Sequence, residues 1–317
     1  MEILGSADAP PADRWPAYFA ERGHAGARRI GAGVEGVVYG LGDGQVAKVW
    51  SGRPPAGLAL TRQVYADLAR HRLPFATPEI LKVEEHEGVL VTYERELAGV
   101  PMGTASGRSE HGRELPTQHC DALLTVLRGL ASVPGTDAMG RLTVQGDDRP
   151  LWRGHQRFQE ALAALVTRAT ARHRAALAAH VPDLDAGVER TRKALRSLPE
   201  TPVTAIHGDL VPPNIHIDPA GRPVAVLDFG FYTTAGDPAF EAAVTAAVWD
   251  MYGPYAAEHS AELTRILAQE LGYAPAALTT YQAVYALTTY DLFGLDDSDW
   301  HFRWCVEQLR RNAVFNA

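Results

Sequence analysis

The sequence predicts a two-lobed α+β protein with a β-rich N-terminal lobe and a mostly helical C-terminal lobe. Short β-branched runs separated by glycine turns fill the first third of the chain, and helical periodicity dominates the remainder. No internal repeat or low-complexity tract interrupts either part. The 317 residues suffice for a full core, and we expect lobes at 1–95 and 96–317.

Composition narrows the class of partner. The chain carries 38 acidic and 30 basic residues, a net charge of −8, which argues against a nucleic acid recognised by charge and suits a cationic small molecule. Two distant cysteines, Cys120 and Cys305, indicate neither a disulfide framework nor a zinc site. Without an apolar leader or a membrane-length apolar run, we expect a cytoplasmic protein with no membrane partner. The oligomeric state is left open, with a monomer favoured.

The first lobe begins with a short amphipathic helix at 12–22, followed by the glycine-rich run 29–39. Its glycines are Gly31, Gly33 and Gly36, and a plain hairpin turn would show the same pattern. A dinucleotide-binding fingerprint must open a helix, whereas here a second strand follows. The context favours a strand, glycine turn and strand that offers backbone N–H groups to phosphates.

Lys48 lies in the next apolar strand, 46–49. Only three lysines occur against twenty-seven arginines, so a lysine inside an apolar strand is notable. A compact ammonium on a flexible stem suits contact with phosphate oxygens. The alternative is a lysine at a strand edge that extends its ammonium into solvent.

The rest of the predicted elements follow from periodicity and from Pro and Gly punctuation. Strands are expected at 80–85 and 89–93, and a loop bordering the substrate at 100–116. Helices are expected at 56–70, 117–132, 153–180, 183–198, 238–252, 258–271, 275–292 and 300–315.

The segment 203–241 organises the predicted site. Three apolar runs at 203–206, 215–217 and 224–227 indicate short strands, and Asp209, Asn214 and Asp228 follow or precede them. Two carboxylates and an amide oxygen converging at strand ends suit a magnesium ion that carries phosphates. The alternative is a β-hairpin with aspartates at ordinary turn positions.

These motifs resemble a known family. His207-Gly208-Asp209, with Asn214 five residues after the aspartate, is followed by Asp228-Phe229-Gly230 and then by Gly236-Asp237-Pro238. The set is similar to the aminoglycoside phosphotransferase and choline kinase family, small-molecule kinases with a protein-kinase-like fold.

The resemblance implies a role for each matching residue. Asp209 would orient the acceptor hydroxyl and take its proton, Asn214 and Asp228 would bind Mg²⁺, and His207 would pack against the Asp228 loop. Asp237 would cap a helix that has Pro238 at its first position, and in the family this aspartate also braces the catalytic loop.

The resemblance also implies a nucleotide site for ATP or GTP. The phosphates would lie against the backbone at the three glycines and against Lys48, and the hinge 92–99, including Glu94 and Glu96, would hold the base by backbone groups. The family's helix glutamate that pairs with this lysine is missing. Gln63 and Asp67 are the two candidates to replace it.

Several features indicate a small-molecule acceptor instead of a protein. Gly208 stands where protein kinases carry an arginine, about nine residues separate Asp228 from Asp237, and no Ala-Pro-Glu follows. The first hypothesis is O-phosphorylation of an aminoglycoside-type antibiotic, conferring resistance. The second is a metabolic kinase for a choline-, amino-alcohol- or sugar-like acceptor, and the third a catalytically weak regulatory pseudokinase.

A cationic acceptor would need carboxylates and aromatic rings from the C-terminal helices and loops. The carboxylate candidates are Glu241, Asp250, Asp291, Asp296, Asp297 and Asp299, and the ring candidates are Trp249, Trp300 and Trp304. Alternatively, the acidic run 296–299 is a solvated turn that caps the last helix.

Overall fold

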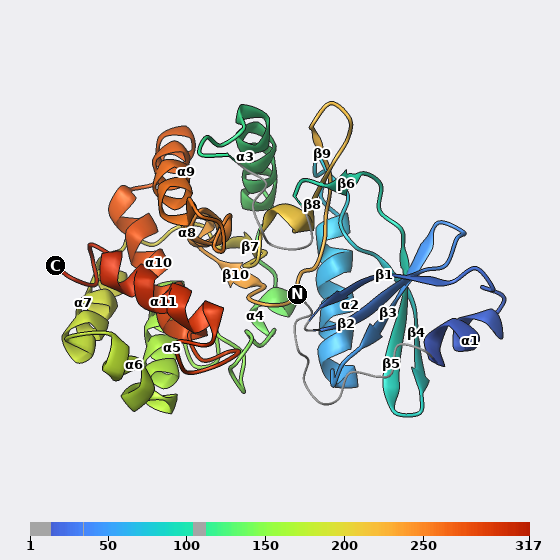
Figure 1. Cartoon of the computed structure of the whole chain (residues 1–317), viewed down its shortest axis with the longest axis horizontal. Coiled ribbons are helices and arrows are strands. Elements are labelled where there is room, and N and C mark those ends of the chain that lie inside the picture. Colours follow the sequence, from blue (N-terminus) through green and yellow to red (C-terminus); the bar gives the residue numbers. More distant parts are fainter. Residues whose placement is uncertain (1–13, 34, 104–111) are drawn as a thin grey trace. The chain divides into compact units, whose positions relative to one another are not determined.

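The computed structural model describes residues 14–33, 35–103 and 112–317. These residues form two compact units. One runs to Arg72 and continues over Ala76–Ala98; the other consists of Leu73–Phe75 and the chain from Gly99 onward. Figure 1 shows the strands of the first unit in blue and cyan and the helices of the second from green to red.

The first unit is built on an antiparallel sheet with the strand order β1-β2-β3-β5-β4. The strands are β1 (Arg28–Gly33), β2 (Gly36–Gly40), β3 (Gln45–Trp50), β4 (Ile80–His86) and β5 (Val89–Arg95). Because β1 and β2 pair antiparallel across the glycine-rich turn, the predicted strand, turn and strand is confirmed.

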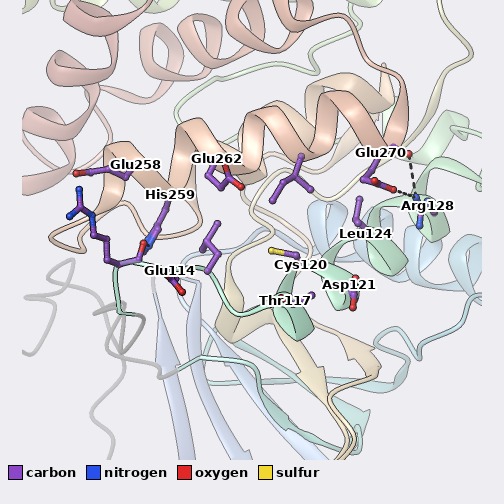
Figure 2. Close-up of a pocket in the computed structure, with 13 residues that line it drawn as sticks. Glu114, Thr117, Cys120, Asp121, Leu124, Arg128, Glu258, His259, Glu262 and Glu270 are labelled. Carbon is purple, nitrogen blue, oxygen red and sulfur yellow. Dashed lines mark hydrogen bonds and ion pairs between the residues drawn. The ribbon is translucent and has the colours of Figure 1, made fainter.

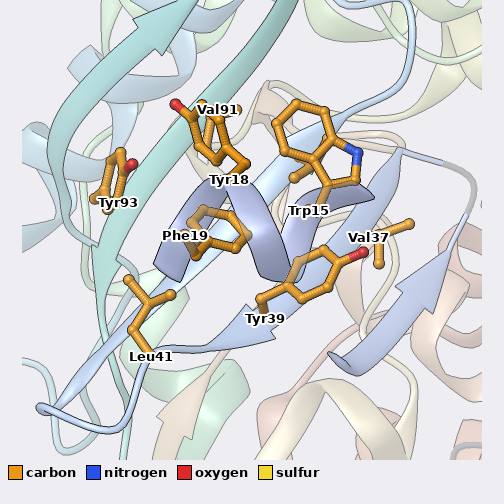
Figure 3. Close-up of a cluster of buried hydrophobic side chains, with 10 residues drawn as sticks. Trp15, Tyr18, Phe19, Val37, Tyr39, Leu41, Val91 and Tyr93 are labelled. Atoms are coloured by element: carbon orange, nitrogen blue, oxygen red, sulfur yellow. The ribbon is translucent and has the colours of Figure 1, made fainter. Parts of the chain in front are cut away.

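One face of this sheet carries the core of the first unit. Helix α1 (Trp15–Ala20) packs its aromatic rings onto alternate residues of β2, β3 and β5 (Figure 3). Successive side chains of a strand point to opposite faces, so the residues between those core positions face the other side. Lys48, paired in register with Val38 and Thr92, therefore lies on the face opposite α1.

Helix α2 (Pro55–Ala69) confirms the helix predicted at 56–70. It begins with Pro55 at its first position, where a missing N–H costs nothing, and it buries Leu58, Val64 and Leu68.

The second unit is mostly helical. Its helices are α3 (Thr117–Ala131), α4 (Asp137–Gly140), α5 (Phe158–Arg172), α6 (Arg174–His180), α7 (Leu184–Ser197), α8 (Pro238–Val248), α9 (Ala256–Leu271), α10 (Pro275–Thr289) and α11 (Trp300–Arg311). Every residue from Ala239 to Val248 is buried, and α3, α9 and α10 all contact α8. Helix α8 is thus the central element of this core, with both its faces covered.

Two small sheets position the predicted catalytic segment. Strand β7 (Thr204–Ile206) pairs with β10 (Thr234–Gly236), and β8 (Ile215–Ile217) lies between β6 (Val100–Pro101) and β9 (Pro223–Val226). The three short strands predicted at 203–206, 215–217 and 224–227 are confirmed as β7, β8 and β9, within one residue at each end.

Predicted and observed bounds differ most for three helices. The single helix expected over 153–180 is two, because the His173 backbone leaves the helical region (φ −132°, ψ 42°) and its N–H donates to the Tyr290 hydroxyl at 3.2 Å. Helix α8 ends at Val248 and not at 252. Helix α11 ends at Arg311 and not at 315, because Asn312 turns extended and its Oδ1 accepts the N–H groups of Val314 and Phe315.

Within the described ranges, the structure contains no helix that combines the length and the apolar character needed to cross a bilayer.

Candidate active site

The loop from His207 to Asn214 joins β7 to β8 and is closed by its own side chains. The Asp209 N–H donates to His207 Nδ1 at 3.2 Å, and Asn214 Nδ2 donates to the Asp209 carbonyl oxygen at 2.9 Å. Donation from Nδ2 turns the amide of Asn214 so that its oxygen faces away from that bond. The predicted site residues 207, 209 and 214 therefore belong to one hydrogen-bonded loop, here called the catalytic loop.

The segment after β9 is tied to the same loop. The Leu227 N–H donates to the Asn214 carbonyl oxygen at 2.9 Å, and His207 Nε2 donates to the Leu227 carbonyl oxygen at 2.7 Å. Asp228 follows directly with φ 62°, a left-handed conformation uncommon for a residue with a side chain, and it is exposed. Glu87 and Asp183 have a similar φ, so the place of Asp228 beside the hydrogen-bonded loop, and not its φ, supports its predicted role.

His207 is a neutral structural group in this arrangement. Its ring is fully buried and packs on Phe229 with the ring centroids 4.3 Å apart. Burial lowers the pKa of its imidazole to about 4, against a smaller opposing effect of the bonded Leu227 carbonyl and the Asp228 charge. With Nε2 donating and Nδ1 accepting, both ring nitrogens are occupied, which leaves the ring no capacity to act as a base.

The side chain of Glu241 binds the backbone of the catalytic loop, a contact that was not predicted from the sequence. Its carboxylate accepts the N–H of His207 and that of Gly208, the latter at 3.0 Å to Oε2. Glu241 is 2% exposed, and its burial raises the pKa of the carboxyl to about 7, although the two N–H donors act to lower it. The prediction that Glu241 contacts an acceptor is wrong, since its oxygens are buried against backbone.

Asp237 has the predicted capping role. Its Oδ1 accepts the Ala239 N–H at 2.9 Å, and Pro238 is the first residue of α8. Its Oδ2 accepts the Tyr281 hydroxyl at 2.8 Å. The carboxylate that holds the backbone of the catalytic loop is that of Glu241, one helical turn later.

Gly208 is required by shape. Its φ is 76°, and a Cβ at this position would lie 2.5 Å from the Tyr232 backbone oxygen, closer than van der Waals contact allows. Replacing Gly208 by any residue with a side chain would therefore require the catalytic loop to move.

Asn214 of the catalytic loop and Asp228 after β9 are a donor set that fits a magnesium ion. Asp228 supplies a carboxylate and Asn214 an amide oxygen, and a hard cation that retains several waters needs only one or two such protein ligands. No group of three or more His, Cys, Asp or Glu side chains able to hold a metal occurs among residues 14–33, 35–103 and 112–317. The described residues therefore contain no site in which protein side chains alone would complete the coordination of a metal.

In the first unit, Lys48 is paired with a glutamate of the glycine-rich turn. Its Nζ lies 2.8 Å from Glu35 Oε2 and 4.1 Å from the centroid of the Trp50 ring. Arg53 binds the other oxygen of Glu35 at 2.6 Å. The carboxylate is therefore shared between two cations, and it comes from the turn and not from α2.

The two residues expected to replace the missing helix glutamate bond to each other. Gln63 Nε2 donates to Asp67 Oδ1 at 2.8 Å, and Arg70 donates to the same oxygen at 2.9 Å. These contacts lie along α2. Sequence reasoning missed Glu35 because the family pattern places the partner of this lysine on the helix.

The remaining nucleotide-site predictions lie on the same sheet. Gly31 lies within β1, Gly33 ends it, and Gly36 begins β2 with φ 151°. A Cβ on Gly36 would lie 2.0 Å from the Val49 carbonyl oxygen, so only glycine lets the turn approach β3. Glu94 is buried in β5 and accepts the Thr92 hydroxyl at 2.6 Å, whereas the Glu96 N–H donates to the Gly44 carbonyl oxygen at 2.9 Å.

The other carboxylates expected to grip a cationic acceptor are mostly engaged. Asp250 pairs with His259 at 2.6 Å with both side chains buried, and Asp291 forms a bidentate pair with Arg172 at 2.7 and 2.9 Å. In the acidic run, Asp296 accepts from Ser298, and Asp299 caps α11 through the Phe302 N–H at 2.7 Å. Asp297 is exposed and lies 3.4 Å from His180 Nδ1. The alternative interpretation, a turn that caps the last helix, is confirmed.

Of the three tryptophans predicted to face the acceptor, Trp249 and Trp304 are buried, at 4% and 7% exposure, and only Trp300 is half-buried.

A cavity of about 730 Å³ lies elsewhere in the second unit, between α3 and α9 (Figure 2). Its lining includes Cys120, Asp121 and His259, together with the surface ion pair between Arg128 and Glu270. No predicted catalytic, metal or nucleotide residue lines it.

Comparison with known proteins decides the family. The family model of the phosphotransferase enzyme family (APH) matches residues 26–283. The chain belongs to this family. It is accordingly a phosphotransferase with an alcohol group as acceptor, and the family resemblance drawn from its motifs is confirmed.

Solved structures of phosphotransferases share the fold. A macrolide 2'-phosphotransferase type I is 21% identical with a TM-score of 0.57, covering 95% of this chain and 98% of its own. Aminoglycoside phosphotransferase APH(3'')-Id from Streptomyces rimosus, in complex with ADP and streptomycin, is 18% identical with a TM-score of 0.54, covering 86% and 97%.

A mutant of aminoglycoside 2'-phosphotransferase-IIIa in complex with GDP gives a TM-score of 0.61 at 14% identity, covering 95% and 94%. The predicted two-lobed, protein-kinase-like α+β fold is confirmed. Among curated proteins, no sequence matches this chain.

Proposed function

We propose that this phosphotransferase transfers the γ-phosphoryl group of ATP or GTP to a hydroxyl of a small-molecule antibiotic. The observation that carries the proposal is the catalytic loop, in which Asp209 and Asn214 are held by hydrogen bonds and joined through Leu227 to Asp228. Proteins of the same fold are named for macrolide and aminoglycoside acceptors, which favours an antibiotic acceptor. The two aminoglycoside phosphotransferase structures contain ADP or GDP, which favours a nucleotide donor.

In the proposed reaction, Asp209 accepts a hydrogen bond from the acceptor hydroxyl and takes its proton. The hydroxyl oxygen forms a bond to the γ-phosphorus while the bond from that phosphorus to the β,γ-bridging oxygen breaks, which releases the nucleoside diphosphate. Because the transition state is loose, catalysis consists mainly of positioning and of neutralising oxygen charge. The rigid hydrogen bonding of the catalytic loop is the property that such positioning requires.

Asn214 and Asp228 are the residues proposed to hold Mg²⁺, and a bound magnesium would neutralise phosphate oxygens. Lys48 and the turn containing Gly31, Gly33 and Gly36 are proposed to contact the donor phosphates. The Glu96 N–H, proposed as a hinge contact to the base, would have to exchange its bond to Gly44 for one to the nucleotide.

The test is acceptor-stimulated release of nucleoside diphosphate by the purified protein. ATP and GTP are each supplied with and without magnesium, and the acceptors are a macrolide, kanamycin, streptomycin, choline and a peptide antibiotic. We expect magnesium-dependent release that rises with at least one antibiotic, confirmed by a mass gain of one phosphate on the acceptor. Stimulation by choline alone would assign a metabolic acceptor, and nucleotide binding without stimulation by any acceptor would contradict the proposal.

A further inference from the structure

Three aromatic side chains of the second unit form a surface cluster that the predicted site does not include. Tyr252 follows α8, Phe293 precedes α11, and Trp300 is the first residue of α11. Tyr252 and Phe293 are 39% and 43% exposed, and they are the two aromatic members of the exposed large apolar side chains among the described residues. We call Tyr252, Phe293 and Trp300 the aromatic platform.

The platform is a packed surface. The Tyr252 and Trp300 rings meet edge to face with centroids 3.8 Å apart, and Phe293 stacks on Trp300 with centroids 5.9 Å apart. Beneath them, His301 contacts the edge of Phe293 at 5.3 Å and stacks on buried Trp304 at 5.7 Å. Rings held in this way present flat apolar area at a low cost in conformational entropy.

A chain of ring contacts connects the platform with the catalytic loop. Trp300 contacts His301, His301 stacks on Trp304, and Trp304 contacts Tyr285. The Tyr285 ring contacts that of Tyr232, whose backbone lies against Gly208, the neighbour of Asp209. Burial and then the charge of Asp209 raise the pKa of the Tyr285 hydroxyl, in agreement with this chain of contacts. The platform and the carboxylate proposed to take the acceptor's proton thus belong to one packed region of the second unit.

Carboxylates around the platform are largely occupied by the protein itself. Asp299 holds the Phe302 N–H, Asp296 holds Ser298, and Asp291 is paired with Arg172. A polyamine would need several free carboxylates to replace the water around its ammonium groups. A single ammonium group, in contrast, can be bound by the face of an aromatic ring and does not need several free carboxylates.

We propose that Tyr252, Phe293 and Trp300 form the acceptor platform, and that the acceptor is a large molecule with an apolar face and one cationic amine. This inference rests on the proposed function and specifies its substrate class. Macrolides have this chemistry, whereas kanamycin presents several ammonium groups and little apolar area. The aminoglycoside-type acceptor, the first hypothesis from sequence, is accordingly the less suitable of the two.

The test is binding of erythromycin, a macrolide with one amine, in the absence of nucleotide, measured by calorimetric titration. We expect erythromycin to bind and kanamycin to bind far more weakly. Phe293→Ala and Trp300→Ala should each weaken erythromycin binding by about 10-fold, the usual size for truncating a central aromatic contact. Tyr252→Phe, which keeps the ring, should bind as the wild type does.

Val203→Ala is the matched control, because Val203 is 39% exposed in the same unit but is not part of the platform. Unchanged thermal unfolding and nucleotide affinity show that each variant is folded. The inference would be overturned if erythromycin did not bind, or if Phe293→Ala and Trp300→Ala bound erythromycin as tightly as the wild type does. Tighter binding of kanamycin than of erythromycin would also overturn it. These outcomes are separate from the proposed function, which fails only if no antibiotic stimulates diphosphate release.

Discussion

Glu241 is a buried residue that binds the backbone of the catalytic loop. It lies 34 positions after His207 in the sequence. Its Oε2 accepts the N–H groups of His207 and Gly208, immediately before Asp209, and its Oε1 also lies 3.3 Å from the Gly208 nitrogen. A sequence pattern shows only an acidic residue in the first turn of a helix, where the helix dipole alone would explain it. The contact to the loop is tertiary, so it could not be predicted.

Glu241→Gln tests whether this carboxyl takes up a proton on folding. With its pKa raised from the ordinary 4.5 to about 7, the folded state holds a proton between these pH values that the unfolded state has lost. The contribution of Glu241 to the free energy of unfolding is therefore complete below pH 4.5 and is lost as the pH rises to 7, by up to about 1.4 kcal/mol per pH unit.

Buried His207 opposes this trend, because its pKa is lowered from 6.5 to about 4 and its contribution is present at high pH and lost on acidification. The measurement is thus the difference in free energy of unfolding between wild type and Glu241→Gln, from urea denaturation at several pH values. We expect that difference to fall as pH rises toward 7. A difference that is constant with pH would refute the assigned pKa.

Gly208→Ala tests the shape requirement of the catalytic loop. The new Cβ would meet the Tyr232 backbone at 2.5 Å, whereas in Gly272→Ala, at nearly the same φ of 72°, nothing lies within 4 Å. Both variants incur the left-handed conformational cost, and only Gly208→Ala adds overpacking, which typically costs about 1–3 kcal/mol. Chemical denaturation should show Gly208→Ala to be the less stable by that amount, and equal loss in the two variants would disprove the close contact.

At the scale of elements, the glycine-rich turn does more than present glycines. Glu35 extends from it to both Lys48 and Arg53, and Arg53 continues to Thr61 of α2 at 2.7 Å. The turn, β3 and α2 are thereby linked by side chains within the first unit. If Lys48 contacts the donor phosphates as proposed, its ammonium would have to exchange its bond to Glu35 for that contact.

The variant Glu35→Gln tests whether Glu35 competes with nucleotide phosphates for Lys48. If nucleotide phosphates and Glu35 compete for the Lys48 ammonium, removing the carboxylate charge should tighten nucleotide binding by about 3- to 10-fold, on the order of 1 kcal/mol. Lys48→Ala should weaken the same binding. Titration with a fluorescent ATP analogue measures both, and weaker binding by Glu35→Gln would mean that Glu35 orients Lys48 and does not compete for it.

The elements were largely predictable, and their ends were not. Apolar runs with β-branched residues and glycine turns indicated where the first five strands lie along the chain, and the strand runs around Asp209 and Asp228 were correct within one residue. The break between α5 and α6 depends on the bond from His173 to Tyr290, more than a hundred positions away. The sequence around His173 contains neither proline nor glycine to mark it.

For the whole molecule, the motifs predicted the family, which is confirmed, and a site, which stays a prediction, while the proposal about the acceptor draws on the structure. Acidic residues of the C-terminal third suggested a cation-binding surface, yet Asp250, Asp291 and Asp299 are each bound to groups of the protein itself. Sequence cannot distinguish a carboxylate that caps a helix from one that awaits a ligand. Exposure and pairing can, and they direct attention to the aromatic platform.

The proposed function depends above all on Asp209 taking the acceptor's proton during phosphoryl transfer. The decisive experiment compares the rate of diphosphate release by wild type and by Asp209→Asn, at saturating ATP, magnesium and the antibiotic that stimulates release. We expect a loss of roughly 10²–10⁴-fold in turnover with nucleotide affinity little changed, the usual size of a lost acid–base and positioning group. Near wild-type turnover by Asp209→Asn would refute the role of Asp209 as the base.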